Sequence, residues 1–400
     1  MKRFFLIPLM IVLVSALILG ACAKPAPPAA EPIKIGMLAS FTGGLAGGWG
    51  ETTAKPGWEL ALEELNYEIA GRPVELFYED DGSFDAVKAL DMTRKLVEVD
   101  QVDILFGPIA SGSWVATTPY MNDLGRLQIT YGWRGEAILW TPGQPRWDVL
   151  AAPLFVQFAY PAGTWAYEQG YRTAVTIGVD YETGYQGAGA FADAFTRAGG
   201  TVVQQVWPPF DTTDWGPYLA SMEEADVVAI IAFGPDIISF VRQSYEFGLW
   251  DKSQVVLLSN DTYQEAQLTE AGDWVLGLVS ATPYTWRVDN PVNNSFVADF
   301  EAKTGFKPGS SSGAIGYHAI KTVVALMEKT GGDTTQEVMR DAIIGLNIDS
   351  PHGFVTITEE GYALMDAFIT EARKTVDGEY VWEVIETYNY VPYAGYYTKP

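Results

Sequence analysis

Short apolar runs alternate with amphipathic stretches along most of the chain. The apolar run 33–38 (IKIGML) is followed by the stretch 56–70, in which apolar residues recur at helical spacing. The predicted apolar face of this helix is formed by Trp58, Leu62, Leu65 and Ile69. Further runs of strand length are 74–80, 102–107, 127–132, 173–180, 201–207, 225–234 and 254–259, and helices are expected at 86–99, 112–124, 186–198, 216–224 and 235–248. This alternation predicts parallel sheets with right-handed crossovers, and two such series in succession predict two doubly wound lobes.

The last third of the chain is less regular. The run 275–284 is expected to continue the second series as a strand, and two helices are expected at 313–332 and 334–346. The final apolar segments are predicted to be antiparallel or edge strands, at 354–358, 367–374 and 380–390. Because no proline- or serine-rich linker divides residues 33–400, we expect several crossing connections between the lobes rather than one.

The first residues have the pattern of a bacterial export signal. Lys2 and Arg3 precede the apolar stretch 4–19, and Leu19-Gly20-Ala21-Cys22 resembles the lipobox, in which the signal is cut before the cysteine and lipid is attached to its thiol. An ordinary secretory signal with a chance cysteine is the alternative. We therefore expect a lipoprotein signal peptide at 1–21 and a proline-rich tether at 22–32. The folded part would then be anchored to the cell membrane through Cys22, facing the periplasm or the cell exterior.

Composition excludes several kinds of site and partner. Cys22 is the only cysteine, and His318 and His352 are the only histidines, so zinc sites and Cys/His nucleophile pairs are excluded. The formal net charge is −25 and becomes more negative once the signal is removed. Such a surface repels nucleic acid and anionic lipid, so we expect no nucleic-acid partner.

The sequence carries no recognisable catalytic constellation. It has no plausible histidine-based triad and no metal cluster, so we expect neither an enzyme nor a cofactor. The acidic run Glu79-Asp80-Asp81 at the end of a predicted strand is interpreted as a solvated strand end, because a glycosidase or cation site needs groups that converge from separate segments.

A glycine-rich segment, SFTGGLAGGWGE (40–51), follows the first predicted strand, where α/β proteins often bind phosphates. The dinucleotide pattern G-x-G-x-x-G fails, because Thr53 stands where a third glycine is required after Gly48 and Gly50. No G-K-[ST] follows, which excludes a P-loop. The glycines instead allow this loop to run close to a ligand between two lobes.

The order of segments resembles the type I periplasmic binding proteins, specifically the leucine/isoleucine/valine-binding proteins of ABC importers. The resemblance covers 33–390 and rests on the following phrases: IKIGMLASFTGGLAGGWGE, ALEELN, YEDDGSFDAVKAL, ILFGPIASGSW, ITYG, TIGVDYETGYQGAGAF, AFGPDIISFVRQSYEFGLW and IGYHAIKTVVALM. It implies an α/β fold of two Rossmann-like lobes joined by three crossing strands, with the ligand in the cleft of this Venus flytrap. The implied first lobe is 33–150 with 283–352, and the implied second lobe is 151–282 with 353–400.

The same resemblance implies a solute-binding protein of an ABC importer. It would act as a lipid-anchored monomer that captures an amino acid, of branched-chain type or a larger aromatic or apolar carboxylate, and delivers it to an ABC permease in the membrane. The alternative is a ligand sensor of the same fold, such as an amide- or amino-acid-responsive regulator. The lipobox argues against that alternative, because those regulators are typically cytoplasmic.

In the first lobe, the family holds the ligand's carboxylate with backbone N–H groups and hydroxyls at helix N-termini. The matching stretch is Ala110-Ser111-Gly112-Ser113, followed by Trp114. A plain N-cap serine at position 111 is the alternative. The second matching loop contains Tyr131, Gly132, Trp133 and Arg134. Gly132 matches a carbonyl that receives the ammonium, whereas Arg134 would either grip a carboxylate or point outward to Glu136 or Asp148.

In the second lobe, the family meets the ammonium with an acidic side chain, and the matching residue is Asp261. The alternative is that Asp261 caps a helix that begins near Tyr263. The aromatic lids of this lobe match Tyr185 and Phe233, and the alternative alignment near Tyr185 would place Thr183 or Gly184 at the contact instead.

Three departures from the family pattern concern the pocket. The family's disulfide in the first lobe is absent, and Ser83 and Ala110 stand at its positions. Trp133 replaces a small residue, and Ser312 stands where an aromatic residue often flanks the ligand. Trp49 falls on the aromatic position beside the ligand's side chain. Tryptophans 49, 114 and 133 on binding loops favour an aromatic or larger apolar ligand.

Overall fold

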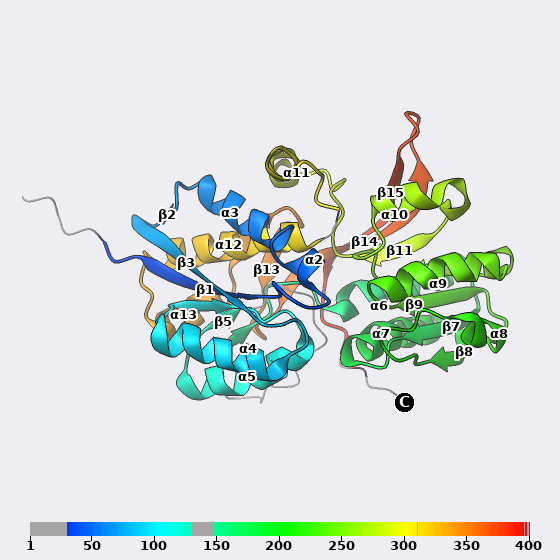
Figure 1. Cartoon of the computed structure of the whole chain (residues 1–400), viewed down its shortest axis with the longest axis horizontal. Helices are drawn as coiled ribbons and strands as arrows, with labels where there is room; N and C mark the ends of the chain where they lie inside the picture. Colours follow the sequence, from blue (N-terminus) through cyan, green and yellow to red (C-terminus); the bar gives the residue numbers. More distant parts are fainter. Residues whose placement is uncertain (1–29, 130–146, 310, 396, 398–399) are drawn as a thin grey trace, which may run out of the picture.

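The computed structural model describes residues 30–129, 147–309, 311–395, 397 and 400. These residues form two α/β lobes, each built around its own sheet (Figure 1). Within the described ranges, no helix combines the length and the apolar character that crossing a bilayer requires. The predicted lipidation site Cys22 and the predicted ligand loop 131–134 lie outside these ranges.

The first lobe contains a six-stranded sheet in the order β2-β3-β1-β4-β5-β6. Its strands are β1 (Ile33–Ala39), β2 (Glu68–Ile69), β3 (Arg72–Asp80), β4 (Ile104–Phe106), β5 (Gln128–Ile129) and β6 (Asp148–Val149). All neighbouring pairs are parallel except the β2–β3 hairpin. The helices of this lobe are α2 (Ala46–Trp49), α3 (Ala54–Glu63), α4 (Ala86–Arg94), α5 (Ser111–Leu124), α11 (Pro291–Thr304), α12 (Ser311–Thr330) and α13 (Gln336–Ile343).

Helices cover both faces of the first sheet. In Figure 1, α3 and α12 lie above the sheet and α4 and α5 lie below it. The contact between α3 and α12 is very close: a Cβ added to Gly57 would lie 2.1 Å from the carbonyl oxygen of Gly313. Only glycine fits there, because any larger residue at position 57 would push the two helix backbones apart.

The second lobe contains a nine-stranded sheet. Its parallel part has the order β8-β7-β9-β10-β11 and is followed by antiparallel strands. The strands are β7 (Thr173–Gly178), β8 (Thr201–Val206), β9 (Val227–Ile231), β10 (Gln254–Leu257), β11 (Val279–Thr282), β12 (Asn347–Ser350), β13 (Gly353–Ile357), β14 (Ala363–Lys374) and β15 (Tyr380–Val391). The helices are α6 (Phe155–Glu168), α7 (Glu182–Ala198), α8 (Gly216–Ala220), α9 (Pro235–Glu246) and α10 (Glu265–Ala271).

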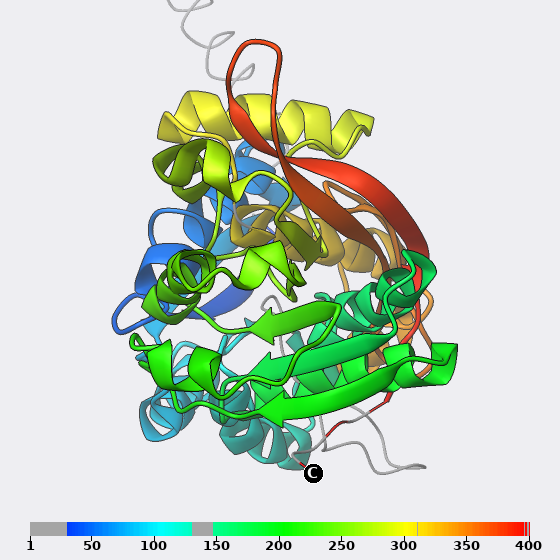
Figure 2. The same ribbon diagram turned by 90° about the vertical axis from the view of Figure 1, so that its right-hand side faces the viewer.

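The carboxy-terminal strands confirm the prediction of antiparallel pairing, since β14 pairs antiparallel with β11, β13 and β15. Figure 2 shows β14 and β15 as one long hairpin whose tip projects from the body of the molecule. The side chain of Val376, at this tip, is fully exposed.

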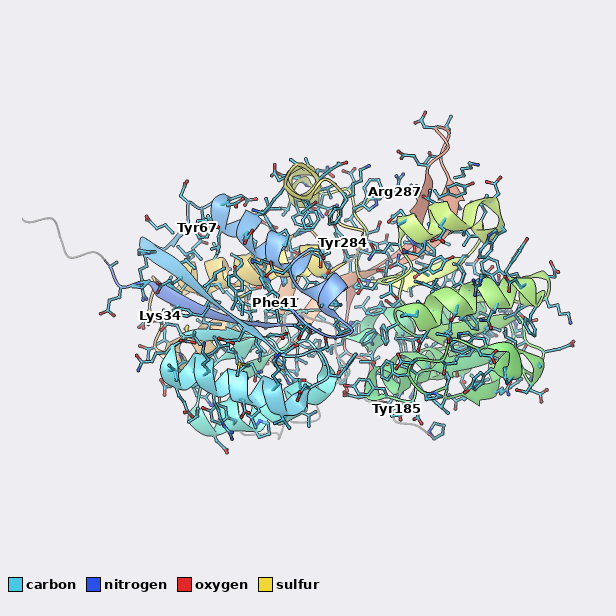
Figure 3. All side chains as sticks on the ribbon, in the orientation of Figure 1. Lys34, Phe41, Tyr67, Tyr185, Tyr284 and Arg287 are labelled. Carbon is cyan, nitrogen blue, oxygen red and sulfur yellow. The ribbon has the colours of Figure 1, made fainter. Side chains whose placement is uncertain are left out.

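The chain passes between the lobes close to two buried histidines. His318 Nε2 donates to the carbonyl oxygen of Ala151 at 2.8 Å, and His352 Nδ1 donates to that of Pro283 at 3.2 Å. The two ring centroids are 6.1 Å apart. Ala151 follows β6 and Pro283 follows β11, so both bonds hold segments that leave one sheet for the other. Figure 3 shows Tyr284, the residue after Pro283, at this junction. Burial lowers the pKa of His318 to about 4 and that of His352 to about 3.

Several element predictions need correction. The helix expected at 56–70 ends at Glu63, because Asn66, Tyr67 and Ala70 have positive φ angles of 51°, 56° and 51° and lead into the β2–β3 hairpin. Helices α6 and α11 and strand β12 were not predicted. The alternation of strands and helices in two series was predicted correctly, as was the two-lobe α/β fold. The exact lobe boundaries stay a prediction.

Candidate functional site

Three loops of the first lobe meet at the carboxyl edge of its sheet, and a buried carboxylate joins them. Asp81 Oδ1 accepts the Ser40 hydroxyl at 2.8 Å and the Ser83 backbone N–H at 2.7 Å. Its Oδ2 accepts the Ile109 N–H at 3.0 Å. These partners lie in the loops after β1, β3 and β4, so one side chain fixes all three loops relative to one another. Asp81 has no exposed surface, and this burial raises its pKa despite the three hydrogen bonds.

The neighbouring Asp80 organises the same edge from a more exposed position. Its carboxylate accepts the backbone N–H groups of Phe41 at 2.9 Å and Thr42 at 3.0 Å, and it also bonds the Lys88 ammonium. Partial burial opposes ionisation, but the bonds from Lys88 and Thr42 hold the pKa of Asp80 well below its usual range. The interpretation of 79–81 as a solvated strand end is therefore wrong for Asp81, whose carboxylate is the central acceptor of the edge.

Ser83 supplies further bonds where the family resemblance placed a disulfide position. Its hydroxyl donates to the Thr42 carbonyl at 2.6 Å and accepts the Leu45 N–H at 3.1 Å. The glycine-rich segment after β1 is thus tied to the loop after β3 by hydrogen bonds.

The amino end of α5 lies directly beside this junction. Ala110 is the N-cap and its side chain makes no capping bond, so the alternative that Ser111 is the N-cap is wrong. Ser111, Gly112 and Ser113 form the first turn; the two serines are buried and Gly112 is exposed. Among the described residues, the Ser113 hydroxyl has no hydrogen-bond partner. An end of this kind presents backbone N–H groups and the positive end of the helix dipole, which suits a carboxylate.

The two predicted tryptophans of the first lobe that are described are both buried. Trp49 ends the short helix α2 with 6% of its surface exposed, and Trp114 lies in the first turns of α5 with 1% exposed. Both belong to a hydrophobic cluster of buried residues that extends from the first lobe into the second. Their contact with a ligand stays a prediction. The third tryptophan, Trp133, lies with Tyr131, Gly132 and Arg134 outside the described residues.

Asp261 occupies the loop between β10 and α10. Its side chain is nearly buried, and its backbone N–H donates to the Ser259 hydroxyl at 3.2 Å. Helix α10 begins at Glu265 with Gln264 as its N-cap, and the Gln264 backbone N–H bonds the side chain of Gln267 at 3.0 Å. The alternative that Asp261 caps a helix beginning near Tyr263 is therefore wrong. Its role toward an ammonium group stays a prediction.

The other predicted residues of the second lobe have separate surroundings. Thr183 is buried in the first turn of α7. Tyr185 lies in the second lobe (Figure 3). There it donates its hydroxyl to Asp180 and packs edge-on against Trp207 at 5.3 Å. The bond to Asp180 raises the pKa of Tyr185 to about 12. The ring of Phe233 packs against that of Phe155, with 5.8 Å between their centroids. Phe155 is the first residue of α6, where the chain enters the second lobe.

One residue that joins the two lobes at this place was not predicted. Tyr181, which precedes α7 in the second lobe, accepts the backbone N–H of Gly112 at 3.0 Å. Its ring also contacts Phe84 of the first lobe at 6.1 Å. No local signal in the sequence connects residues 112 and 181, because the contact depends on how the lobes are placed.

Ser312, the second residue of α12, is fully buried. It therefore lies inside the first lobe rather than on its surface. The absence of an aromatic residue from a ligand pocket at this position stays a prediction.

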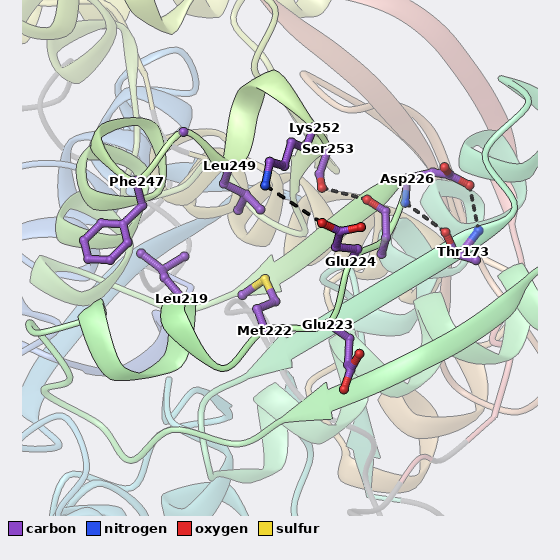
Figure 4. Close-up of a pocket in the computed structure, with 12 residues that line it drawn as sticks. Thr173, Leu219, Met222, Glu223, Glu224, Asp226, Phe247, Leu249, Lys252 and Ser253 are labelled. Atoms are coloured by element: carbon purple, nitrogen blue, oxygen red, sulfur yellow. Dashed lines mark hydrogen bonds and ion pairs between the residues drawn. The ribbon is translucent and has the colours of Figure 1, made fainter.

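A separate hollow of about 550 Å³ lies at the other edge of the second sheet (Figure 4). Its walls include Thr173, Asp226 and Ser253, which stand at the amino ends of β7, β9 and β10. Doubly wound sheets bind ligands at the opposite, carboxyl edge. The Asp226 carboxylate already accepts the backbone N–H groups of Arg172 and Thr173, at 2.7 and 2.9 Å. We therefore place the candidate site at the carboxyl edges and not in this hollow.

Comparisons with known proteins agree with this architecture. A family model described as "Periplasmic binding protein" matches residues 32–377. Leu/Ile/Val-binding protein homolog 6 from Brucella melitensis is 24% identical over 364 residues, which cover 90% of this chain and 92% of that protein.

Two solved structures extend the comparison. An ABC transporter substrate-binding protein from Sphaerobacter thermophilus has a TM-score of 0.83 and 30% identity, with 90% of this chain and 99% of that chain covered. A solute-binding protein of an ABC transporter from R. palustris, in complex with 4-hydroxybenzoate, has a TM-score of 0.81 and 24% identity, with coverage of 90% and 98%.

Proposed function

Because the chain belongs to the type I periplasmic binding proteins, in the Leu/Ile/Val-binding family of ABC-transporter solute-binding proteins, we propose that it captures a small organic carboxylate between its lobes. Solute-binding proteins of this kind bind small molecules and are not enzymes. The proposed solute is an amino acid of branched-chain type or a larger aromatic or apolar carboxylate. The protein would bind it outside the cytoplasm and pass it to an ABC permease in the membrane.

The observation that carries this proposal is the amino end of α5, where the N-cap residue Ala110 makes no side-chain capping bond. Its first turn combines the buried hydroxyls of Ser111 and Ser113 with the backbone N–H groups of the helix start, of which that of Gly112 is bonded to the Tyr181 hydroxyl. A carboxylate bound there would accept several hydrogen bonds and interact favourably with the helix dipole. Asp81 supports this function because it bonds Ile109, two residues before α5 begins.

Asp261 separates the two proposed solute classes. An amino acid brings an ammonium group that an acidic side chain of the second lobe would stabilise, whereas a benzoate has no such group. The test includes leucine, isoleucine and valine because the Brucella relative is a Leu/Ile/Val-binding protein homolog. It includes 4-hydroxybenzoate because the R. palustris structure is a complex with that compound.

Thermal-shift screening followed by calorimetry tests the proposal on the folded protein. Leucine, isoleucine, valine, phenylalanine, benzoate, 4-hydroxybenzoate and neutral sugars form the panel, and a ligand that binds only the folded state raises the melting temperature. We expect a carboxylate to bind and the double variant Ser111→Ala/Ser113→Ala to bind it at least about tenfold more weakly.

Thr118→Val is the matched control, because it removes another buried hydroxyl of α5 at a distance from the amino end. Asp261→Asn should lower the affinity for an amino acid and leave the affinity for a benzoate unchanged. Binding of a neutral sugar without any carboxylate would refute the proposed site.

Loss of solute uptake by cells that lack the gene tests delivery to a permease, and labelling with radioactive fatty acid tests the lipid anchor on Cys22.

A further inference from the structure

Tyr181 connects the second lobe to the end of α5 at which the carboxylate is proposed to bind. Its hydroxyl oxygen lies 3.0 Å from the backbone nitrogen of Gly112, the second residue of the helix. Gly112 has no side chain to keep the hydroxyl away, and a Cβ added there would lie 3.2 Å from the Tyr181 oxygen. The contact joins residues 69 positions apart in sequence and in different lobes.

Aromatic side chains from both lobes hold the Tyr181 ring in place. The Phe84 ring of the first lobe lies 6.1 Å from it, and the Phe210 ring of the second lobe lies 5.3 Å from it. Phe84 and Phe210 also contact each other at 5.6 Å, although Phe84 remains 50% exposed. These three rings form an apolar contact between the lobes beside the hydrogen bond to Gly112.

The chemistry of the hydroxyl adds a second role. In accepting the Gly112 N–H, the Tyr181 oxygen uses a lone pair, and its own proton remains to be donated. Burial raises the pKa of Tyr181, so this proton stays on the oxygen at neutral pH. A hydroxyl that accepts a hydrogen bond also becomes a stronger donor through polarisation.

We propose that Tyr181 latches the second lobe onto the carboxylate site: its oxygen accepts the Gly112 N–H, and its proton is donated to the carboxylate of the bound solute. The inference rests on the proposed function for the identity of the solute. The contact between the lobes is independent of it. Tyr181 thereby makes closure of the lobes and recognition of the carboxylate a single event.

Tyr181→Phe tests the latch, because phenylalanine keeps the ring packing and removes only the hydroxyl. Tyr380→Phe is the matched control, since Tyr380 also belongs to the second lobe and its hydroxyl bonds Asp273 of that lobe at 2.5 Å. We expect Tyr181→Phe to raise the dissociation rate of the carboxylate ligand about tenfold, as the loss of one or two hydrogen bonds predicts. The control should leave this rate unchanged, and both variants should have circular dichroism spectra like that of the wild type.

Small-angle X-ray scattering without added ligand tests the contact separately. Tyr181→Phe and Phe84→Ala should both increase the radius of gyration, while Tyr380→Phe should not. An unchanged radius in both variants would overturn the latch, whatever the solute is. Tighter carboxylate binding by Tyr181→Phe would also overturn it, because the hydroxyl would then be a competitor. If no carboxylate binds the wild type but the radius still changes, the proposed function fails and the contact between the lobes stands.

Discussion

Asn in place of Asp81 is expected to loosen the amino end of α5 while changing almost no volume. An asparagine whose oxygen occupies the Oδ1 position keeps the bonds from Ser40 and Ser83, which are 2.8 and 2.7 Å long. Its amide nitrogen then faces the Ile109 N–H, which loses its acceptor at 3.0 Å. A buried donor without a partner costs about 1 to 3 kcal/mol. Because burial already raises the pKa of Asp81, removing the buried charge returns part of that free energy, and we expect a net loss of about 1 to 2 kcal/mol.

Urea unfolding at pH 7 measures the loss of stability, and calorimetry measures the affinity for the ligand that the panel identifies. If the loosened end of α5 must be ordered again on binding, the affinity falls by up to about tenfold for a cost of 1.4 kcal/mol. Asp85→Asn is the matched control in the same loop. Asp85 caps α4 by accepting the Val87 and Lys88 N–H groups through Oδ1, and asparagine caps a helix equally well. Equal stability and affinity of the two variants would refute the assignment of Asp81 as the residue that joins the loops.

Three further predictions concern packing, pH and the ligand. Gly57→Ala should destabilise the first lobe by several kcal/mol in thermal unfolding, because its methyl would meet the Gly313 carbonyl, whereas Gly47→Ala, whose methyl meets nothing within 4 Å, should be tolerated. The folded-state pKa values of His318 and His352, about 4 and about 3, lie below the value near 6.5 of an unfolded chain. The stability that the two neutral rings contribute is therefore fully present above pH 6.5 and is lost as the pH falls toward 4. The free energy of unfolding should fall by up to about 1.4 kcal/mol per pH unit for each ring. Urea midpoints at pH 7 and pH 5 should therefore differ less in His352→Gln than in the wild type, and equal differences would contradict the linkage. Trp49→Phe should reduce the free energy of binding of an aromatic carboxylate more than it reduces the free energy of unfolding measured in urea. The opposite ranking would make Trp49 a core residue only.

The periodic pattern predicted the elements whose environment is uniform along their length. Strands of a parallel sheet are buried on both faces and appear as short apolar runs, which is why β1, β4, β7, β9 and β10 were found. Helix α6 was missed because most of its residues are buried, so that it has no polar face to mark a period, and because Pro161 lies inside it. The helix expected at 56–70 was too long, since Ile69 keeps the apolar spacing but serves β2 after a left-handed turn.

The candidate site could be predicted only where a local pattern marks it. A strand followed by small residues and a helix predicts that Ser111, Gly112 and Ser113 lie at the start of a helix. In the structure they form the first turn of α5. The role of Asp81 was misjudged, because an acidic residue at a strand end is normally solvated and its burial depends on loops 28 and 41 residues away. Tyr181 could not be found at all from one sequence, since its partner belongs to the other lobe.

Asp81 and Tyr181 both bond the backbone at the amino end of α5. Asp81 bonds the backbone two residues before α5, and Tyr181 bonds the backbone of its second residue. Neither side chain needs to recognise the body of the solute, so both can serve a branched-chain amino acid and a benzoate equally. Selectivity between these solutes must then come from side chains that contact the rest of the molecule, with Trp49 and Asp261 as the proposed residues. Variants at Asp81 and Tyr181 should accordingly weaken all carboxylate ligands by a similar factor, while variants at Asp261 should change their order of affinity.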